Sequence, residues 1–232
     1  MLKISIKGYT GSFRNPNSMK YQETLPFPPP TTIVGILGAA SGYDFMKAQK
    51  TFSDLSFGIK VEKCFGQAVD LWAIRKFDRG RPTRKAIVKR EMLVYPEFTL
   101  FVKAEEKMLQ KIQNALNHPV YPLSLGRDDE LITSLYSKII DAENVEQGKI
   151  ENTVIQGKIS PGDISADIDE LTDNFNSFKV YKLVKVFKEN KRTKARLPGD
   201  YTEYTYVDKK VLYKGNLIKI NGEEVPIWRW NV

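Results

Sequence analysis

The residues from 75 to 90 carry a dense run of positive charge in this chain of 232 residues, with eight arginines and lysines against one aspartate, a net charge of +7. Arginine offers a planar set of five donors that matches phosphate oxygens and stacks on bases. The run therefore predicts a polyanionic partner, of which nucleic acid is the commonest. Eight contacts to a single strand would give a slope of log affinity against log salt of up to about −5 or −6. The basic residues are Arg75, Lys76, Arg79, Arg81, Arg84, Lys85, Lys89 and Arg90.

Two other short motifs have residue types suited to phosphate. Thr31 and Thr32 follow a proline run at the start of a predicted helix, where unpaired N–H groups and hydroxyls either hold a phosphate or simply cap the helix. Gly126 and Arg127 follow a predicted strand and form either an ordinary turn or a close phosphate contact. The glycines of residues 35–42 lie inside a helical pattern without a Gly-Lys-Ser or Gly-Lys-Thr sequence, which favours helix packing over nucleotide binding.

Catalytic chemistry has few candidate residues in this sequence. His118 is the one histidine, at the end of a predicted helix, where it is either structural or a general base assisted by Tyr21, Tyr121 or Lys111. The acids of residues 128–130 form either a metal-binding pair or the start of a helix. We expect no metal and no cofactor.

Composition bounds the class of protein. The net charge is +8, and 41% of the residues are hydrophobic, which is enough for a core. No apolar run approaches the length of about 18 residues that a membrane-spanning helix needs, so we expect no membrane partner. Cys64 is the one cysteine, which excludes an internal disulfide and fits a cytoplasmic setting. Residues 141–176 carry a net charge of −7, with no role evident, and residues 179–196 carry +7, on either a solvated face or a strand.

The elements that must position these residues follow from hydrophobic periodicity. Alternation predicts strands and a period near 3.6 predicts helices, separated here by proline and glycine. The predicted order is strand, helix, strand, strand, helix, strand, which is a ferredoxin-like unit of the kind found in RNA-recognition domains. The basic arm interrupts it after the second strand. The four strands are predicted over residues 2–7, over residues 57–64 with the same pattern resuming at 68–74, over residues 92–102 and over residues 120–125, and the helices over residues 33–42 and 105–116.

Two regions are expected from this pattern. Residues 1–132 form the ferredoxin-like domain with a protruding basic β-hairpin arm at about 75–91, so the fold class is α+β. Residues 133–232 form an acidic, loop-rich region followed by a small antiparallel β subdomain. The strands predicted there cover residues 178–188, 201–207, 211–213, 217–220 and 225–230.

Three segments carry a family resemblance. GSFRNP at residues 11–16, QETLPFPPPTTIVGILGAASG at residues 22–42 and YPLSLGRDD at residues 121–129 resemble the signatures of the fifth family of CRISPR-associated proteins. Members of that family are RAMP-superfamily subunits of type I Cascade antiviral surveillance complexes. The resemblance is strongest over residues 1–130 and closest to the type I-A and I-B forms.

The resemblance implies a non-catalytic subunit that binds the 5′ handle of the crRNA, beside the backbone and large subunits of the complex, and contacts target DNA only indirectly. It also implies a thumb-like arm between the second and third strands of the ferredoxin-like core. In type I-C systems the family member is itself the ribonuclease, which leaves a metal-independent endoribonuclease using His118 as the alternative, although Asn117 stands where a lysine is expected. A general basic RNA-binding module is a third possibility. Together with the basic run of residues 75–90, the expected RNA-binding residues are Arg14, Gln22, Thr31, Thr32, Gly126 and Arg127.

Overall fold

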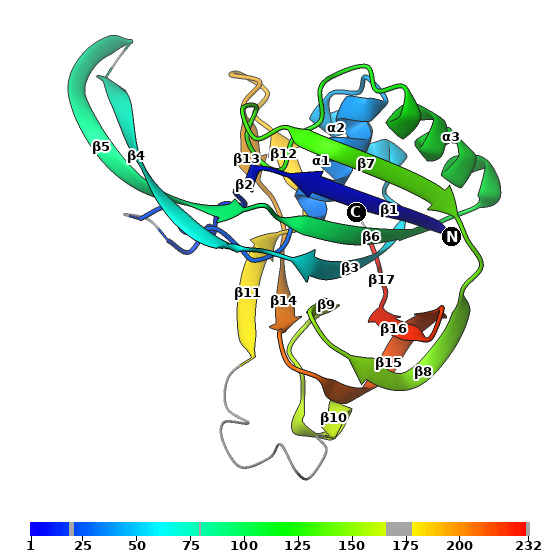
Figure 1. Cartoon of the computed structure of the whole chain (residues 1–232). Helices are drawn as coiled ribbons and strands as arrows, with labels where there is room; N and C mark the ends of the chain where they lie inside the picture. The colour runs from blue at the N-terminus through cyan, green and yellow to red at the C-terminus, as the bar shows by residue number, and fades with distance from the viewer. Residues whose placement is uncertain (19–20, 79, 166–177, 231–232) are drawn as a thin grey trace.

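The computed structural model describes residues 1–18, 21–78, 80–165 and 178–230, and only the backbone of residues 76–78, 82–83 and 161 (Figure 1). The fold mixes α and β structure, with strands predominating over three helices in the described ranges. Its largest sheet has the strand order β11-β14-β9-β3-β6-β1-β7, with β17 paired to β3. Its strands are β1 (Leu2–Gly8), β3 (Ser56–Lys63), β6 (Glu97–Lys103), β7 (Ile132–Ile139), β9 (Thr153–Gln156), β11 (Lys179–Val184), β14 (Tyr201–Val207) and β17 (Trp228–Arg229).

The predicted alternation in the first strand is confirmed. Leu2, Ile4 and Ile6 of β1 are buried and join the main hydrophobic core, whereas the residues between them are partly exposed. β1 lies between β6 and β7, and both pairings are antiparallel. β1 therefore presents one apolar face to the core and is the strand next to β7 at one edge of the sheet.

Three helices gather on one side of this sheet (Figure 1). They are α1 (Pro30–Ala40), α2 (Phe45–Thr51) and α3 (Glu106–Asn117). Proline at the first position of α1 costs no hydrogen bond, because that N–H has no helical partner. The helical period predicted α1 and α3. It missed α2, which has only seven residues and is fixed by Asp44, whose side chain accepts a hydrogen bond from the Lys47 N–H at 2.8 Å.

The strand predicted over residues 120–125 is wrong. Val120 and Tyr121 are exposed and donate their N–H groups to the carbonyls of Ala40 and Ala39 at the end of α1, not to a sheet. The strand that follows α3 in the sheet is β7, and residues 120–130 form a loop that returns to α1 first. The acids of residues 128–130 accordingly lie in a turn instead of starting a helix.

A long antiparallel hairpin projects from the body of the protein (Figure 1). Its strands are β4 (Gly66–Asp78) and β5 (Arg81–Val94), and β2 (Thr10–Gly11) pairs with β5 at the base. The sequence placed a strand only as far as residue 74, whereas pairing continues to the Asp78–Arg81 pair. Gly80 has a φ of 81°, which suits glycine in the turn.

Residues beyond 140 form strands in several places. A second sheet contains β8 (Glu143–Ile150), β10 (Ile164–Ser165), β15 (Val211–Ile220) and β16 (Glu223–Pro226), and a short 3-10 helix covers Pro161–Asp163. The acidic segment expected to be loop-rich thus contributes strands to two sheets. A separate two-stranded hairpin joins β12 (Phe187–Glu189) to β13 (Arg196–Pro198). No helix within the described ranges is long and apolar enough to cross a bilayer.

Candidate nucleic-acid interface

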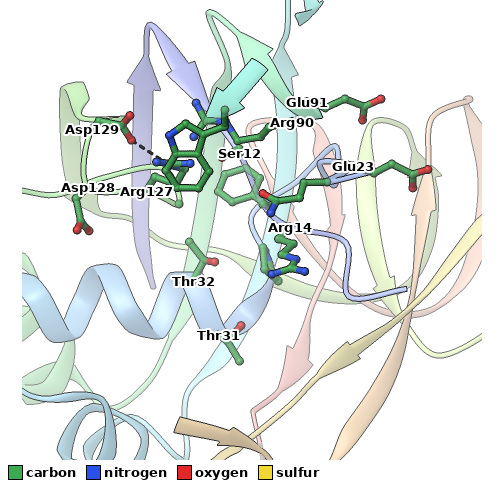
Figure 2. A pocket seen from close by; sticks show the side chains of 15 residues that line it. Ser12, Arg14, Glu23, Thr31, Thr32, Arg90, Glu91, Arg127, Asp128 and Asp129 are labelled. Atoms are coloured by element: carbon green, nitrogen blue, oxygen red, sulfur yellow. Dashed lines mark hydrogen bonds and ion pairs between the residues drawn. The ribbon is translucent and has the colours of Figure 1, made fainter. Parts of the chain in front are cut away.

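A cavity of about 770 Å³ opens at the base of the long hairpin (Figure 2). Four segments that are far apart in the sequence build it: the loop after β2, the first turn of α1, the base of the β4–β5 hairpin and the turn at residues 126–129. We call this cavity the cleft. Seven of the residues expected to bind RNA line it, namely Arg14, Gln22, Thr31, Thr32, Arg90, Gly126 and Arg127.

Arg90 is the most buried charged side chain of the cleft, with an exposed fraction of 6%. One terminal nitrogen, Nη2, donates to Asp70 Oδ2 across the hairpin at 3.1 Å. Its Nε and Nη1 atoms are also buried and have no hydrogen-bond partner in the described part of the chain. Buried donors are normally satisfied, so Arg90 keeps unused hydrogen-bonding capacity at the wall of the cleft.

Trp72 of β4 contacts two arginines at the edge of the cleft. Its ring centroid lies 3.7 Å from the guanidinium carbon of Arg127 and 5.4 Å from that of Arg90. The sequence analysis did not select Trp72. The hairpin pattern could have identified it: Trp72 pairs with Val88 across the hairpin, and Val88 is two residues from Arg90, so Trp72 and Arg90 lie on the same face. The ring is 39% exposed, which leaves surface on which a base can stack.

The turn at Gly126 is fixed by its backbone. Gly126 has a φ of 118°, and a Cβ atom there would overlap the carbonyl oxygen of Ser12, so this position requires glycine. Beside it, the buried carboxylate of Glu130 accepts hydrogen bonds at Oε2 from the N–H and Oγ of Ser12 at 2.9 and 2.8 Å, and from the N–H of Arg127 at 3.1 Å. Glu130 therefore joins the turn to the loop after β2 and sets the position of Arg127.

Arg127 reaches the cleft from this turn. Its Nε donates to Asp129 at 3.2 Å, a contact drawn in Figure 2. Its guanidinium carbon lies over the ring of Trp72. The group is therefore held in place by two contacts, while its outer nitrogens have no hydrogen-bond partner among the described residues.

The first turn of α1 faces the cleft through Thr31 and Thr32, both half-buried (Figure 2). No side chain of the described chain caps this end of the helix, and the first turn contains no acid. The partial positive charge of the helix N-terminus is therefore not offset locally.

Carboxylates also line the cleft, Asp128 and Asp129 in the turn that carries Arg127, and Glu23 and Glu91 elsewhere in its wall (Figure 2). Glu23 accepts from the Asn15 amide at 3.2 Å, and Glu91 accepts from the Thr24 N–H at 3.2 Å. A hydrogen bond to Glu91 raises the pKa of the Tyr21 hydroxyl. The lining of the cleft thus combines three arginines (Arg14, Arg90 and Arg127) with four carboxylates (Glu23, Glu91, Asp128 and Asp129), a mixture that suits a ligand carrying both phosphates and amino groups.

The outer part of the long hairpin lies away from the cleft. The residues of the basic run there are exposed, and within the described ranges no carboxylate of this chain pairs with them: Arg75, Arg81, Arg84 and Lys85. Lys89 is also exposed, but it lies at the base of the hairpin, where its carbonyl accepts from the Gln22 N–H at 3.0 Å. Lys76 is described only by its backbone, and Arg79 lies outside the described residues. Arg90 is the exception, since it folds back onto Asp70.

The residues considered for catalysis do not meet in one place. His118 is the exposed C-cap of α3, and it does not line the cleft. A hydrogen bond from Lys111 lowers the pKa of Tyr43, so this lysine has a partner other than the histidine. Tyr121 is exposed beside the end of α1, and Tyr21 lies near Glu91.

Comparison with known families gives one clear match. The model of the family described as CRISPR-associated protein (Cas_Cas5) matches residues 1–175 of the chain. Among curated protein sequences, none matches the chain significantly.

Several solved structures are similar. A chain from a "CRISPR RNA-guided surveillance complex" has a TM-score of 0.59 and 17% sequence identity, and the match covers 93% of this chain and 90% of that one. A chain described as "Crystal structure of Cas protein" is 24% identical with a TM-score of 0.40, and the match covers 57% of this chain and 59% of that one, so this chain spans less than two thirds of that protein. A chain of the "Type III-B Cmr-beta bound to cognate target RNA and AMPPnP" is 11% identical with a TM-score of 0.45, covering 91% and 86%.

Proposed function

Because this chain belongs to the Cas5 family of CRISPR-associated proteins, we propose that it is a non-catalytic subunit of a type I surveillance complex and binds the 5′ handle of the crRNA in the cleft. In this proposal its partners in that complex are a backbone subunit and a large subunit, and it is a subunit of the type I-A or I-B kind. One observation carries the proposal. Residues expected to bind RNA come from four separate segments and line a single cavity beside a basic hairpin.

The order of the elements supports the ferredoxin-like core that this role implies. β1, α1, β3, β6, α3 and β7 follow one another along the chain, and the four strands stand side by side in the order β3-β6-β1-β7. The long hairpin leaves this core between β3 and β6. That position fits the thumb-like arm that the resemblance implies, so the exposed cations of the hairpin would contact the RNA outside the cleft.

The charged groups of the cleft suggest how RNA would lie in it. Phosphates would face Arg90, Arg127 and the first turn of α1, where the unpaired N–H donors and the helix dipole favour negative charge. A base would stack on Trp72. Base amino groups would face Glu23 and Glu91, because carboxylates accept hydrogen bonds from such donors.

Binding measurements test the proposal. The full chain should bind labelled repeat-derived handle RNA more tightly than a scrambled RNA of equal length, and Arg127→Ala should weaken handle binding by about 10- to 100-fold through the loss of charged hydrogen bonds. The matched control is Arg229→Ala, since Arg229 also pairs with an exposed aspartate, Asp54, at 3.1 Å but lies outside the cleft. Equal affinity for handle and scrambled RNA would overturn the proposal and support a general RNA-binding module.

Incubation of the same RNA with the protein in EDTA tests the absence of catalysis. We expect the RNA to remain intact. Cleavage at one position that His118→Ala abolishes would instead identify an endoribonuclease.

A further inference from the structure

We propose that the second basic hairpin, β12–β13 with its connecting residues 190–195, forms another RNA contact on the far side of α1 and continues the handle path out of the cleft. This inference rests on the proposed function, since it extends the same RNA across the protein surface. It assigns a role to the end of the basic run at residues 179–196, which the sequence left open.

The hairpin carries a surplus of unpaired positive charge. Residues 187–198 contain five arginines and lysines and one acid, Glu189. Glu189 pairs with Lys194 at 3.3 Å, and Lys188 lies 3.8 Å from Asp200. Lys191 and Arg192 at the tip are exposed and have no ion pair among the described residues. Two cations therefore project from the tip and are free to contact phosphate.

A buried glutamine holds this hairpin against α2. The side chain of Gln49 is 6% exposed; its Oε1 accepts from the Phe187 N–H at 2.7 Å and its Nε2 donates to the Phe187 carbonyl at 3.0 Å. The turn is ordered by Asn190, whose side-chain oxygen accepts from the N–H groups of Arg192 and Thr193 at 2.9 and 3.1 Å. The tip cations are thus carried by a fixed element, which reduces the entropy lost on binding.

A cavity of about 330 Å³ connects the hairpin to the cleft. It shares Thr31, Thr32, Gly126 and Asp128 with the cleft, and Phe187 and Arg196 of the hairpin also line it. The guanidinium carbon of Arg196 is 5.5 Å from the ring of Phe187. The first turn of α1 therefore faces both cavities, and a strand leaving the cleft over this turn meets the second hairpin.

Gly35 supplies an independent indication. It lies inside α1, is exposed, and lines the second cavity, yet apart from its chain neighbours and the backbone of α1 no described atom stands within 4 Å of where its Cβ would be. Glycine inside a helix lowers helix stability relative to alanine, and no neighbour in the described structure requires it here. Close approach of an external ribose-phosphate backbone to this face of α1 explains the missing side chain.

Fluorescence anisotropy with labelled handle RNA tests the inference on the full chain. The double variant Lys191→Ala/Arg192→Ala should bind about tenfold more weakly than the wild type, and the slope of log affinity against log salt should be shallower by about 1.4. The matched control is Lys209→Ala/Lys210→Ala, which removes the same charge from the exposed turn between β14 and β15. The control should change affinity by less than about twofold.

A second variant separates RNA contact from misfolding. Gly35→Gln adds a good helix former without charge, so its melting temperature should equal or exceed that of the wild type while handle affinity falls at least about fivefold. If the wild type binds the handle and both the tip variant and Gly35→Gln bind equally well, this inference is wrong and the proposed function stands. If the wild type shows no preference for the handle, the proposed function fails and this inference falls with it.

Discussion

Removal of the Glu130 carboxylate should destabilise the turn that carries Arg127. Glu130 is 2% exposed, and its Oε2 accepts three hydrogen bonds. In Glu130→Ala the Ser12 N–H keeps a second partner, the Leu125 carbonyl at 3.0 Å, whereas the Ser12 hydroxyl and the Arg127 N–H lose theirs. Each donor left unsatisfied costs about 1–3 kcal/mol.

The second oxygen of this carboxylate lowers the expected net effect. Oε1 of Glu130 is buried and has no partner among the described residues, so removing the charge recovers part of its desolvation cost. We therefore expect Glu130→Ala to lower the free energy of unfolding by about 2–3 kcal/mol. Glu130→Gln keeps the shape and one accepting oxygen and should cost about 1–2 kcal/mol.

Urea unfolding followed by far-UV circular dichroism measures both variants. At a slope of about 2–3 kcal/mol per molar urea, Glu130→Ala should shift the midpoint down by about 1 M. Glu62→Ala, which removes an exposed acid of β3, is the control and should shift it by less than about 0.2 M. Equal midpoints for Glu130→Ala and the control would refute the assignment of Glu130 as the residue that joins Ser12 to the Arg127 turn.

Three further predictions concern the cleft and the body of the protein. Trp72→Ala should weaken handle binding by about tenfold, because stacking on an aromatic ring contributes about 1–3 kcal/mol per base, whereas Trp72→Phe should keep most of the affinity; equal losses in both variants would contradict stacking. Gly35→Ala should raise the melting temperature by about 2–4 °C in differential scanning fluorimetry, since alanine stabilises a helix interior by about 1 kcal/mol, and a lower melting temperature would show that Gly35 has a role within the fold. Burial raises the pKa of Tyr206 to about 12 from the ordinary 10.0, so the contribution of its neutral hydroxyl to the free energy of unfolding should be fully present below pH 10 and be lost as the pH rises from 10 toward 12. Tyr206→Phe should reduce this loss of stability, and the same dependence of stability on pH in the variant and the wild type would contradict the assignment.

Local periodicity was sufficient to predict several elements. The alternation in β1 and the amphipathic face of α3, with Leu109 and Ile112 buried, are properties of consecutive residues, and both predictions are confirmed. The same reasoning failed at residues 120–125. There an apolar sequence resembles a strand, but hydrogen bonds to the end of α1 fix a loop, and those partners lie far away in the sequence.

The site was predictable where residue type alone indicates the chemistry. Arginines and the Gly-Arg pair were selected for phosphate, and the structure brings Arg14, Arg90 and Arg127 to one cavity. Trp72 and Glu130 were not predicted, because the residues that they contact lie in other segments of the chain. Trp72 meets Arg127 only after the hairpin folds across the turn, and Glu130 meets Ser12 only after the loop that follows β2 returns to the sheet.

The division of the basic charge also depends on the fold. Arg90 and Lys89 are neighbours in sequence, but strand alternation sends one into the cleft and the other to solvent. The sequence count treated all eight basic residues of the run as equivalent. The structure instead separates one buried, partly paired arginine from the exposed cations of the outer hairpin.

Photocrosslinking of handle RNA that contains 4-thiouridine, followed by mass spectrometry of the crosslinked peptides, tests the central claim most directly. We expect crosslinks on the residues that surround the cleft, in the segments 12–14, 22–23 and 126–129 and at Trp72. Crosslinks confined to β8, β15 and β16 of the second sheet, with none in the cleft, would contradict it.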